Sequence, residues 1–340
     1  MKKFFMFAAM VSVALTSCVK NEPVATVEQG DLITFNSPVV APATKATNNE
    51  DAIAFPHADF SAYAWYAKKD VYDGADASLY FANRTFADKG TYWGSNPASF
   101  WPKNGKLTFV AYAPVTNGPS VVTADNATDS KTLTVSYTVQ DAIASQVDVL
   151  YSDWVANKTS TSDTYETANK YGDTGIDLPF HHALSAVKFQ IKAKSADVAP
   201  YLKIKNITLS GVKNSGNLTI PFNGDAYWST GSGDASYTVL TSDDAATSKA
   251  FTGTNVINLN DGTQFILYPQ TLNAELTVVY YMKTDGDWLE QTLPVELTDT
   301  WEMGRRYTYT LIFDLDEIKL APVVAEEWAD ESGVDVNAKL

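Results

Sequence analysis

The sequence predicts an all-β protein made of two tandem β-sandwiches, and three observations lead to this prediction. Apolar and polar residues alternate with a period of two in several segments, as they do in strands with one buried face. An Asp-Gly pair separates two of these segments, which is typical of a β-hairpin. Downstream of residues 1–17, the chain contains no convincing amphipathic α-helix of ordinary length.

The expected strands can be placed in order along the chain. Residues 32–36 form the first one, and the Pro-rich stretch at 37–50 that follows cannot continue as a helix. Alternation then predicts strands over residues 107–112, 133–139, 187–192, 276–283, 287–293 and 307–315. The best candidate for a short helix is residues 141–154, where Ile143, Val147, Leu150 and Tyr151 would share one face.

A turn-rich polar stretch between residues 157 and 177 is typical of a domain junction or of a long loop between strands. We therefore divide the chain into four parts. These are a signal peptide at 1–17, a tether with the first strand at 18–45, an N-terminal β-sandwich at 46–177 and a C-terminal β-sandwich at 178–340.

The composition argues against several classes of function. The 340 residues carry 25 Lys and Arg against 40 Asp and Glu, a net charge of −15, so we expect no nucleic-acid partner. The single cysteine, Cys18, excludes an internal disulfide framework and a cysteine-based zinc site. Of the three histidines, His181 and His182 are adjacent on an expected strand and would point to opposite faces. We predict no enzymatic activity, no cofactor and no metal.

The N-terminus predicts export and lipid attachment. Two lysines precede an apolar stretch that is too short to span a membrane, as in a secretory signal peptide. This stretch ends in Leu15-Thr16-Ser17-Cys18, which resembles a bacterial lipobox. Cleavage would fall between Ser17 and Cys18, and Cys18 would carry the lipid. The alternative is an ordinary secretory peptide that happens to end near a cysteine.

Aromatic residues gather between Tyr92 and Trp101. Trp93 and Trp101 would suit a platform that stacks against sugar rings. The alternative is that they fill the core of a sandwich, where aromatic side chains are common, and we favour this packing role.

Several segments together resemble the fimbrillin family of Bacteroidales lipoproteins, the type V pilins that include Mfa-like proteins. They include Phe100-Trp101-Pro102, Ile266-Leu267-Tyr268-Pro269-Gln270 and residues 107–114, 148–151, 178–189, 304–309 and 327–330. The resemblance implies two transthyretin-like Greek-key sandwiches in a fimbrial structural or adhesive subunit of the outer membrane surface. Its implied partners are other fimbrial subunits, the outer membrane through a lipid anchor, and host or bacterial surface ligands. The rival hypothesis is a surface glycan-binding lipoprotein.

The resemblance also implies an assembly route by strand exchange. A protease would cut after a basic residue, here between Lys45 and Ala46, and release a first strand that contains Leu32, Ile33 and Phe35. A C-terminal strand of the next subunit, here with Ile318, Leu320 and Val323, would then fill the groove. Two alternatives remain open: Lys45 as an exposed linker residue, and residues 318–324 as a permanent edge strand of their own domain.

Overall fold

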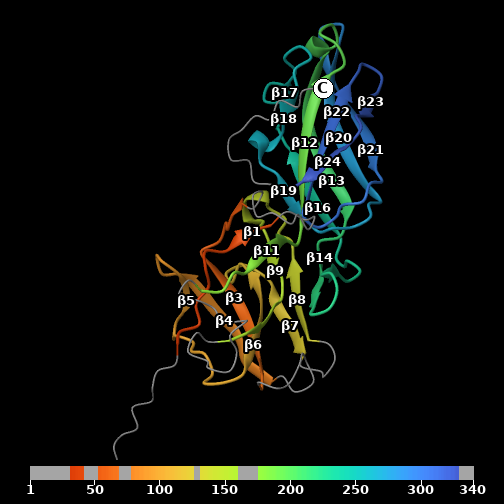
Figure 1. Ribbon diagram of the computed structural model, residues 1–340. Helices are drawn as coiled ribbons and strands as arrows, with labels where there is room; N and C mark the ends of the chain where they lie inside the picture. The colour runs from red at the N-terminus through yellow and green to blue at the C-terminus, as the bar shows by residue number, and fades with distance from the viewer. Residues whose placement is uncertain (1–30, 42–52, 69–77, 126–130, 160–174, 329–340) are drawn as a thin grey trace, which may run out of the picture.

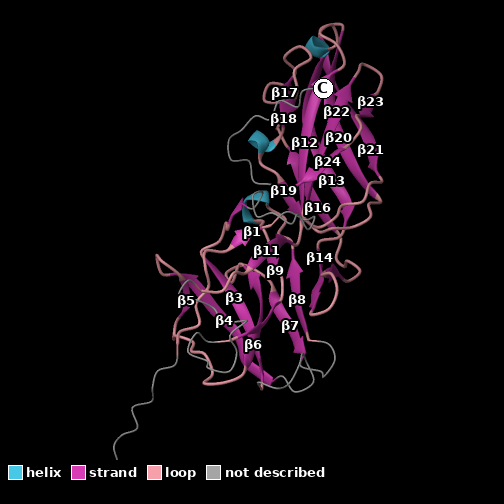
Figure 2. Ribbon diagram, viewed as in Figure 1, coloured by secondary structure: helices cyan, strands magenta, loops and turns pink. Residues whose placement is uncertain are grey.

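The computed structural model describes residues 31–41, 53–68, 78–125, 131–159 and 175–328. Within these residues the regular secondary structure is almost entirely strand, and the helical elements are short 3₁₀ turns (Figure 2). These turns are η2 (Ile143–Ser145), η3 (Ala199–Tyr201) and η4 (Asn260–Gly262). Figure 1 shows an elongated molecule with two lobes arranged end to end. The all-β prediction is confirmed, while the transthyretin-like topology stays a prediction.

In the part of the chain that the structure describes, the N-terminal lobe consists of a nine-stranded and a four-stranded sheet. The larger sheet runs in the order β2 (Ile53–Ala54), β1 (Val39–Val40), β11 (Pro179–His182), β9 (Leu150–Ser152), β6 (Lys106–Ala113), β3 (Asp59–Ala67), β4 (Ser78–Asp88) and β5 (Trp93–Ser95), with β10 (Val155–Lys158) also on β6. The smaller one contains β15 (Tyr227–Trp228), β14 (Ser215–Pro221), β8 (Thr132–Thr138) and β7 (Ser120–Asp125).

The C-terminal lobe has a six-stranded and a five-stranded sheet among the described residues. The first contains β18 (Ile257–Asn258), β12 (Ser185–Ala193), β22 (Arg305–Phe313) and β23 (Ile318–Leu320), with β19 (Phe265–Leu267) on β12 and β24 (Val324–Glu327) on β22. The second contains β16 (Ala235–Leu240), β13 (Leu202–Val212), β20 (Ala274–Thr284) and β21 (Asp287–Leu297), with β17 (Lys249–Ala250) on β13.

Strand β6 is buried on both faces of the nine-stranded sheet. Val110 and Tyr112 belong to the hydrophobic cluster that also contains the apolar side chains of β8 and β14. Leu107, Phe109 and Ala111 point the other way, into a second cluster. Because every residue of β6 is buried, the nine-stranded sheet needs a cover on each face.

The N-terminal lobe takes strands from both sides of residue 177, the boundary that the composition suggested. Strand β11 follows that residue but pairs with β1 and β9. The β14–β15 hairpin comes from still further along the chain and adds to β8. These pairings are long-range, so a change in local composition does not reveal them.

Residues 141–154, the best candidate for a short helix, do not form one. The structure has only the 3₁₀ turn η2 there, followed by β9. Leu150 pairs with His182 of β11 and with Ala113 of β6, and it is fully buried between them. Pairing with two neighbouring strands therefore outweighs the local helical periodicity.

The predicted hairpin is confirmed, and its turn depends on a backbone conformation that favours glycine. Strands β20 and β21 pair up to Thr284 and Asp287, which leaves Asp285 and Gly286 as a two-residue turn. Their φ angles are 50° and 97°, and both are in the left-handed region that such a turn requires.

We expect Gly286→Ala to lower the free energy of unfolding by about 1–2 kcal/mol, the cost of a left-handed L-residue. No atom lies within 4 Å of the added Cβ, so the cost would come from the backbone alone. Urea unfolding followed by tryptophan fluorescence measures it. Asp285→Asn is the control and should be neutral, because asparagine tolerates this conformation. Equal midpoints for the two variants would contradict the assignment of the turn.

Candidate functional site

The first-strand segment, residues 31–41, lies between two backbone edges of the N-terminal lobe. Toward residues 93–101, the hydrogen bonds run from Ile33 N–H to Ser99 O (2.8 Å), Phe35 N–H to Trp93 O (2.9 Å), Trp93 N–H to Phe35 O (2.8 Å) and Trp101 N–H to Asp31 O (2.8 Å). On the other side, Ile176 N–H donates to Thr34 O and Asn36 N–H to Ile176 O. Both edges thus use this segment as their backbone partner.

Two of the three residues predicted for the first strand are buried beneath these edges. The exposed fraction is 1% for Ile33 and 0% for Phe35, whereas Leu32 is 45% exposed. The Phe35 ring lies edge-to-face against Phe60, Phe86 and Phe109, with centroid distances of 5.3, 4.8 and 5.6 Å. This edge-to-face arrangement is the favourable one for aromatic pairs. The segment therefore covers the second face of the nine-stranded sheet.

Strand β1 extends the segment in a place where the sequence suggested no strand. Val39 and Val40 pair in parallel with β11 and antiparallel with β2. Val40 is buried, and Ala41 N–H donates to Phe180 O at 2.7 Å. Ile33, Phe35 and Val40 are thus the three apolar side chains by which the segment is held.

Gly175 lets the second edge come close to the segment. Its φ angle is +90°, and a Cβ atom there would lie 2.9 Å from the carbonyl carbon of Phe35. A larger residue would therefore collide with the segment, and only glycine fits the position without strain. This function for a residue of the turn-rich stretch was not apparent from the sequence.

Trp93 and Trp101 lie beside the first-strand segment and do not form an exposed platform. Each is 7% exposed. The Trp93 ring stacks on Phe60 at 5.6 Å, and the Trp101 ring lies edge-to-face against Phe109 at 5.7 Å. Neither ring face is available to a sugar, so the packing alternative holds in this structure.

Other predicted positions lie outside the described residues. These are Ser17 and Cys18 at the expected signal cleavage and lipid attachment site, and Lys45 and Ala46 at the expected protease site.

The predicted donor residues lie in the C-terminal edge segment, residues 318–327, which comprises β23 and β24. Both strands pair antiparallel with β22 of their own lobe, and Pro322 separates them. Ile318, Leu320 and Val323 are only half-buried, and Val324 is 56% exposed. The structure thus has this segment as an edge strand of its own domain, which was one of the two alternatives.

The adjacent histidines contact different carboxylates, as expected for neighbours on a strand. His181 Nε2 lies 3.1 Å from Asp153 Oδ1, and His182 Nδ1 lies 2.9 Å from Asp148 Oδ2. His182 is buried and stacks on Trp328 with the ring centroids 4.0 Å apart, while His181 is partly exposed. The pair therefore has no common ligand position, and His182 joins the end of the C-terminal edge segment to the N-terminal lobe.

An open groove of about 910 Å³ is lined mainly by residues of the N-terminal lobe, including Tyr151, Trp154, His181, Phe222 and Asp225, and also by Met303. Burial, together with the nearby carboxylates of Asp153 and Asp225, raises the pKa of Tyr151 to about 12. The Tyr151 hydroxyl therefore stays protonated at neutral pH. It can donate a hydrogen bond there.

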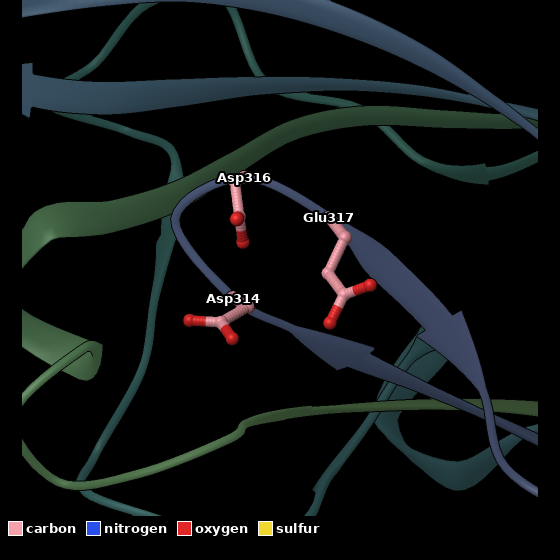
Figure 3. A group of neighbouring side chains, drawn as sticks. All are labelled: Asp314, Asp316 and Glu317. Carbon is pink, nitrogen blue, oxygen red and sulfur yellow. The ribbon is translucent and has the colours of Figure 1, made fainter.

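Three acidic side chains, Asp314, Asp316 and Glu317, surround the turn between β22 and β23 (Figure 3). Lys194 pairs with Asp314, and Lys319 Nζ lies 2.5 Å from Glu317 Oε1. The hydrogen bond from Lys194 lowers the pKa of Asp314. Because lysines already pair with two of the three carboxylates, we interpret the cluster as a stabilised turn and assign no metal to it.

Comparison with known proteins now identifies the family. A family model described as fimbrillin-like matches residues 44–328, which is most of the chain. The chain belongs to the fimbrillin-like family. The resemblance found in the sequence is therefore confirmed. Comparison with curated proteins gave no match.

Solved structures are similar to this fimbrillin-like protein over nearly their full length. A candidate cell adhesion protein from Bacteroides uniformis has 16% identity and a TM-score of 0.51, with 88% of this chain and 99% of that chain covered. Another, from Bacteroides ovatus, has 14% identity and a TM-score of 0.48, with 89% of this chain and 99% of that chain covered. The fimbrial anchor protein Mfa2 from Porphyromonas gingivalis has 12% identity and a TM-score of 0.39, with 88% of this chain and 98% of that chain covered. Among the described residues, no helix is long and apolar enough to cross a membrane.

We expect Phe35→Ala to destabilise the fimbrillin-like protein by about 3–5 kcal/mol, as large-to-small changes of buried phenylalanine do. The loss would show in urea unfolding and in faster amide exchange at Trp93, whose N–H bonds to Phe35 O. Leu32→Ala is the matched control in the same segment and should stay within about 0.5 kcal/mol, because Leu32 is exposed. Equal small effects would mean that the segment is not held by Phe35.

Proposed function

We propose that this fimbrillin-like protein is the lipid-anchored precursor of a fimbrial subunit that assembles by strand exchange on the outer membrane surface. Membership of the fimbrillin-like family supports the fimbrial role. The observation that carries the proposal is the position of the first-strand segment. It completes the N-terminal lobe, yet only residues 42–52 join it to the rest of the described chain.

The first-strand segment occupies a groove between residues 93–101 and residues 175–176, which we call the first-strand groove. If the segment left, this groove would need another strand. Removal of the segment would expose apolar surface and leave backbone N–H and C=O groups unpaired on both edges. Burial of Ile33, Phe35 and Val40 is worth roughly 5–9 kcal/mol gross, at about 1.5–3 kcal/mol each. A strand from a second molecule can recover this free energy through backbone pairing and through side chains at alternate positions.

Cleavage between Lys45 and Ala46 would allow the first-strand segment to leave and strand exchange to begin. In the sequence this bond lies between β1 and β2, so cleavage would leave residues 18–45 attached by noncovalent contacts alone. While the bond is intact, the segment competes for the groove at an effective concentration of the order of millimolar, as for other short linkers. A dilute donor from outside cannot displace it under these conditions.

The donor strand would come from another subunit. The C-terminal edge segment, with Ile318, Leu320 and Val323, is the candidate because its apolar side chains are only half-buried where they lie. On leaving β22 it would give up its strand pairing there, and pairing with the edges of the groove would replace it.

The N-terminus would direct export and anchor the protein in the membrane. After removal of residues 1–17, Cys18 would carry acyl chains such as palmitate, each buried CH₂ contributing about 0.8 kcal/mol to membrane binding. Once the chain is part of a fibre, its exposed surface would contact host or bacterial surface ligands. The role is structural or adhesive and not catalytic. The rival glycan-binding function has lost its main support, because Trp93 and Trp101 are buried.

Purified surface fibres provide the test. We expect N-terminal sequencing of the wild-type subunit in them to begin at Ala46. Lys45→Gln should prevent incorporation, because the first-strand segment then stays attached and the groove stays filled. In Lys45→Gln cells the protein should remain in the membrane fraction with Cys18 as its first residue.

Lys68→Gln is the control, since Lys68 is an exposed lysine outside the strands. It should enter fibres normally. Wild-type fibres whose subunits begin at Cys18, or normal incorporation of the Lys45→Gln variant, would contradict strand exchange at this groove.

A further inference from the structure

The C-terminal edge segment repeats the sequence pattern of the first-strand segment. The first-strand segment reads Ile33-Thr34-Phe35-Asn36-Ser37-Pro38-Val39-Val40-Ala41, and the edge segment reads Ile318-Lys319-Leu320-Ala321-Pro322-Val323-Val324-Ala325. Both have two apolar residues separated by one polar residue, followed by Pro-Val-Val-Ala. The edge segment has one residue fewer before the proline.

We propose that the edge segment of a second copy of this chain occupies the first-strand groove in the register that this repeat defines. Ile318 takes the place of Ile33, Leu320 that of Phe35, and Val324 that of Val40. The inference rests on the proposed function. That function requires a donor strand, but it specifies neither that the donor resembles the first-strand segment nor which donor residue takes each position in the groove.

The backbone of the edge segment meets the hydrogen-bond requirements of the groove. The first-strand segment donates from the N–H groups of residues 33, 35, 36 and 41. The corresponding donor residues are 318, 320, 321 and 325, and none of them is proline. Pro322 falls on the position of Pro38, which has no N–H either. A shift by one residue would place Pro322 at a different position and break this match.

Burial favours the transfer. Ile33, Phe35 and Val40 are at most 1% exposed in the groove. In its own lobe, Val324 is 56% exposed, and Ile318 and Leu320 are half-buried. The same pattern of apolar side chains is thus fully enclosed at one end of the molecule and partly exposed to water at the other, so an emptied groove would bury the apolar side chains of the edge segment more completely than its own lobe does.

The one-residue difference is compatible with this register. Phe35 and Val40 are five residues apart and both are buried, which a straight strand does not allow, so the chain bends at residues 36–38. Leu320 and Val324 are four residues apart. A straight strand places both on the same face and can reach the two pockets without that bend.

The positions of donor and acceptor predict an open chain of subunits. The first-strand segment lies in the N-terminal lobe and the edge segment in the C-terminal lobe (Figure 1). The contact therefore joins different surfaces of two identical molecules. Repeated contacts of this kind produce a filament unless the rotation closes a ring.

A disulfide between copies tests the register. Leu32 and Phe100 are opposite residues of an antiparallel bridge, flanked by the bonds from Ile33 N–H to Ser99 O and from Trp101 N–H to Asp31 O. They form a non-hydrogen-bonded pair, whose Cα atoms are typically about 4.5 Å apart, within disulfide reach. In the proposed register Glu317 of the second copy replaces Leu32. The test variant is therefore Phe100→Cys with Glu317→Cys.

The experiment uses the full chain with Cys18→Ser, so that the introduced cysteines are the only ones, and with a site for a specific protease in place of residues 44–47. Phe100→Cys with Lys319→Cys is the matched control, two residues out of register on the same face of the strand. After cleavage and mild oxidation, we expect disulfide-linked oligomers from the Glu317 pair, at least tenfold more than from the Lys319 pair. Before cleavage, neither pair should form them.

The outcomes separate the two levels of the proposal. A cleaved chain that stays monomeric in size-exclusion chromatography would overturn strand exchange itself. Oligomers that lack the Phe100–Glu317 disulfide, or that form the Lys319 disulfide equally well, would overturn only the register. Leu320→Phe gives a second measurement: it restores the ring of Phe35 and should increase the oligomer yield, whereas Leu320→Ser should decrease it. The opposite order would also overturn the register.

Discussion

The structure depends on one constraint, which is that the nine-stranded sheet of the N-terminal lobe is apolar on both faces. Its central strand β6 is buried throughout, and its neighbour β3 contributes side chains to both hydrophobic clusters. The four-stranded sheet covers one face. The other face is covered by residues 93–101 and by a segment that precedes the rest of the fold in sequence. A sheet of this kind is stable only with both covers in place.

The two lobes differ in which segments cover their apolar surfaces, and this difference gives the molecule a direction. In the C-terminal lobe, apolar side chains of β12, β22, β13 and β20 share one hydrophobic cluster, which continues into the N-terminal lobe through β8 and β14. There the indole of Trp301 donates to the hydroxyl of Tyr309, so both buried polar groups are satisfied. The N-terminal lobe instead depends on the first-strand segment. An acceptor in one lobe and a donor segment in the other would give a strand-exchange polymer its direction.

Much of the fold could be predicted because its strands are long and regularly alternating. Strands β8, β12 and the β20–β21 hairpin repeat apolar residues at period two, and an Asp-Gly turn is a strong local signal. Burial of Ile33 and Phe35 follows the same pattern. The rest depends on contacts between distant residues. Two-residue strand β1 is defined by its partners, the β14–β15 hairpin joins the other lobe, and composition alone cannot distinguish the buried Trp93 from an exposed ring.

The C-terminal edge segment is held at its ends and is weakly packed in its middle. At one end, Lys194 and Lys319 stabilise the acidic turn that precedes β23. At the other, Trp328 is buried against His182 of the N-terminal lobe. Between them, Pro322 interrupts the strand, which keeps an exposed edge from pairing indiscriminately with other chains. Such a segment stays in place in the monomer by contacts at its ends, while its exposed apolar side chains gain most from an enclosed groove. Retention before assembly and transfer during it are therefore compatible in one short sequence.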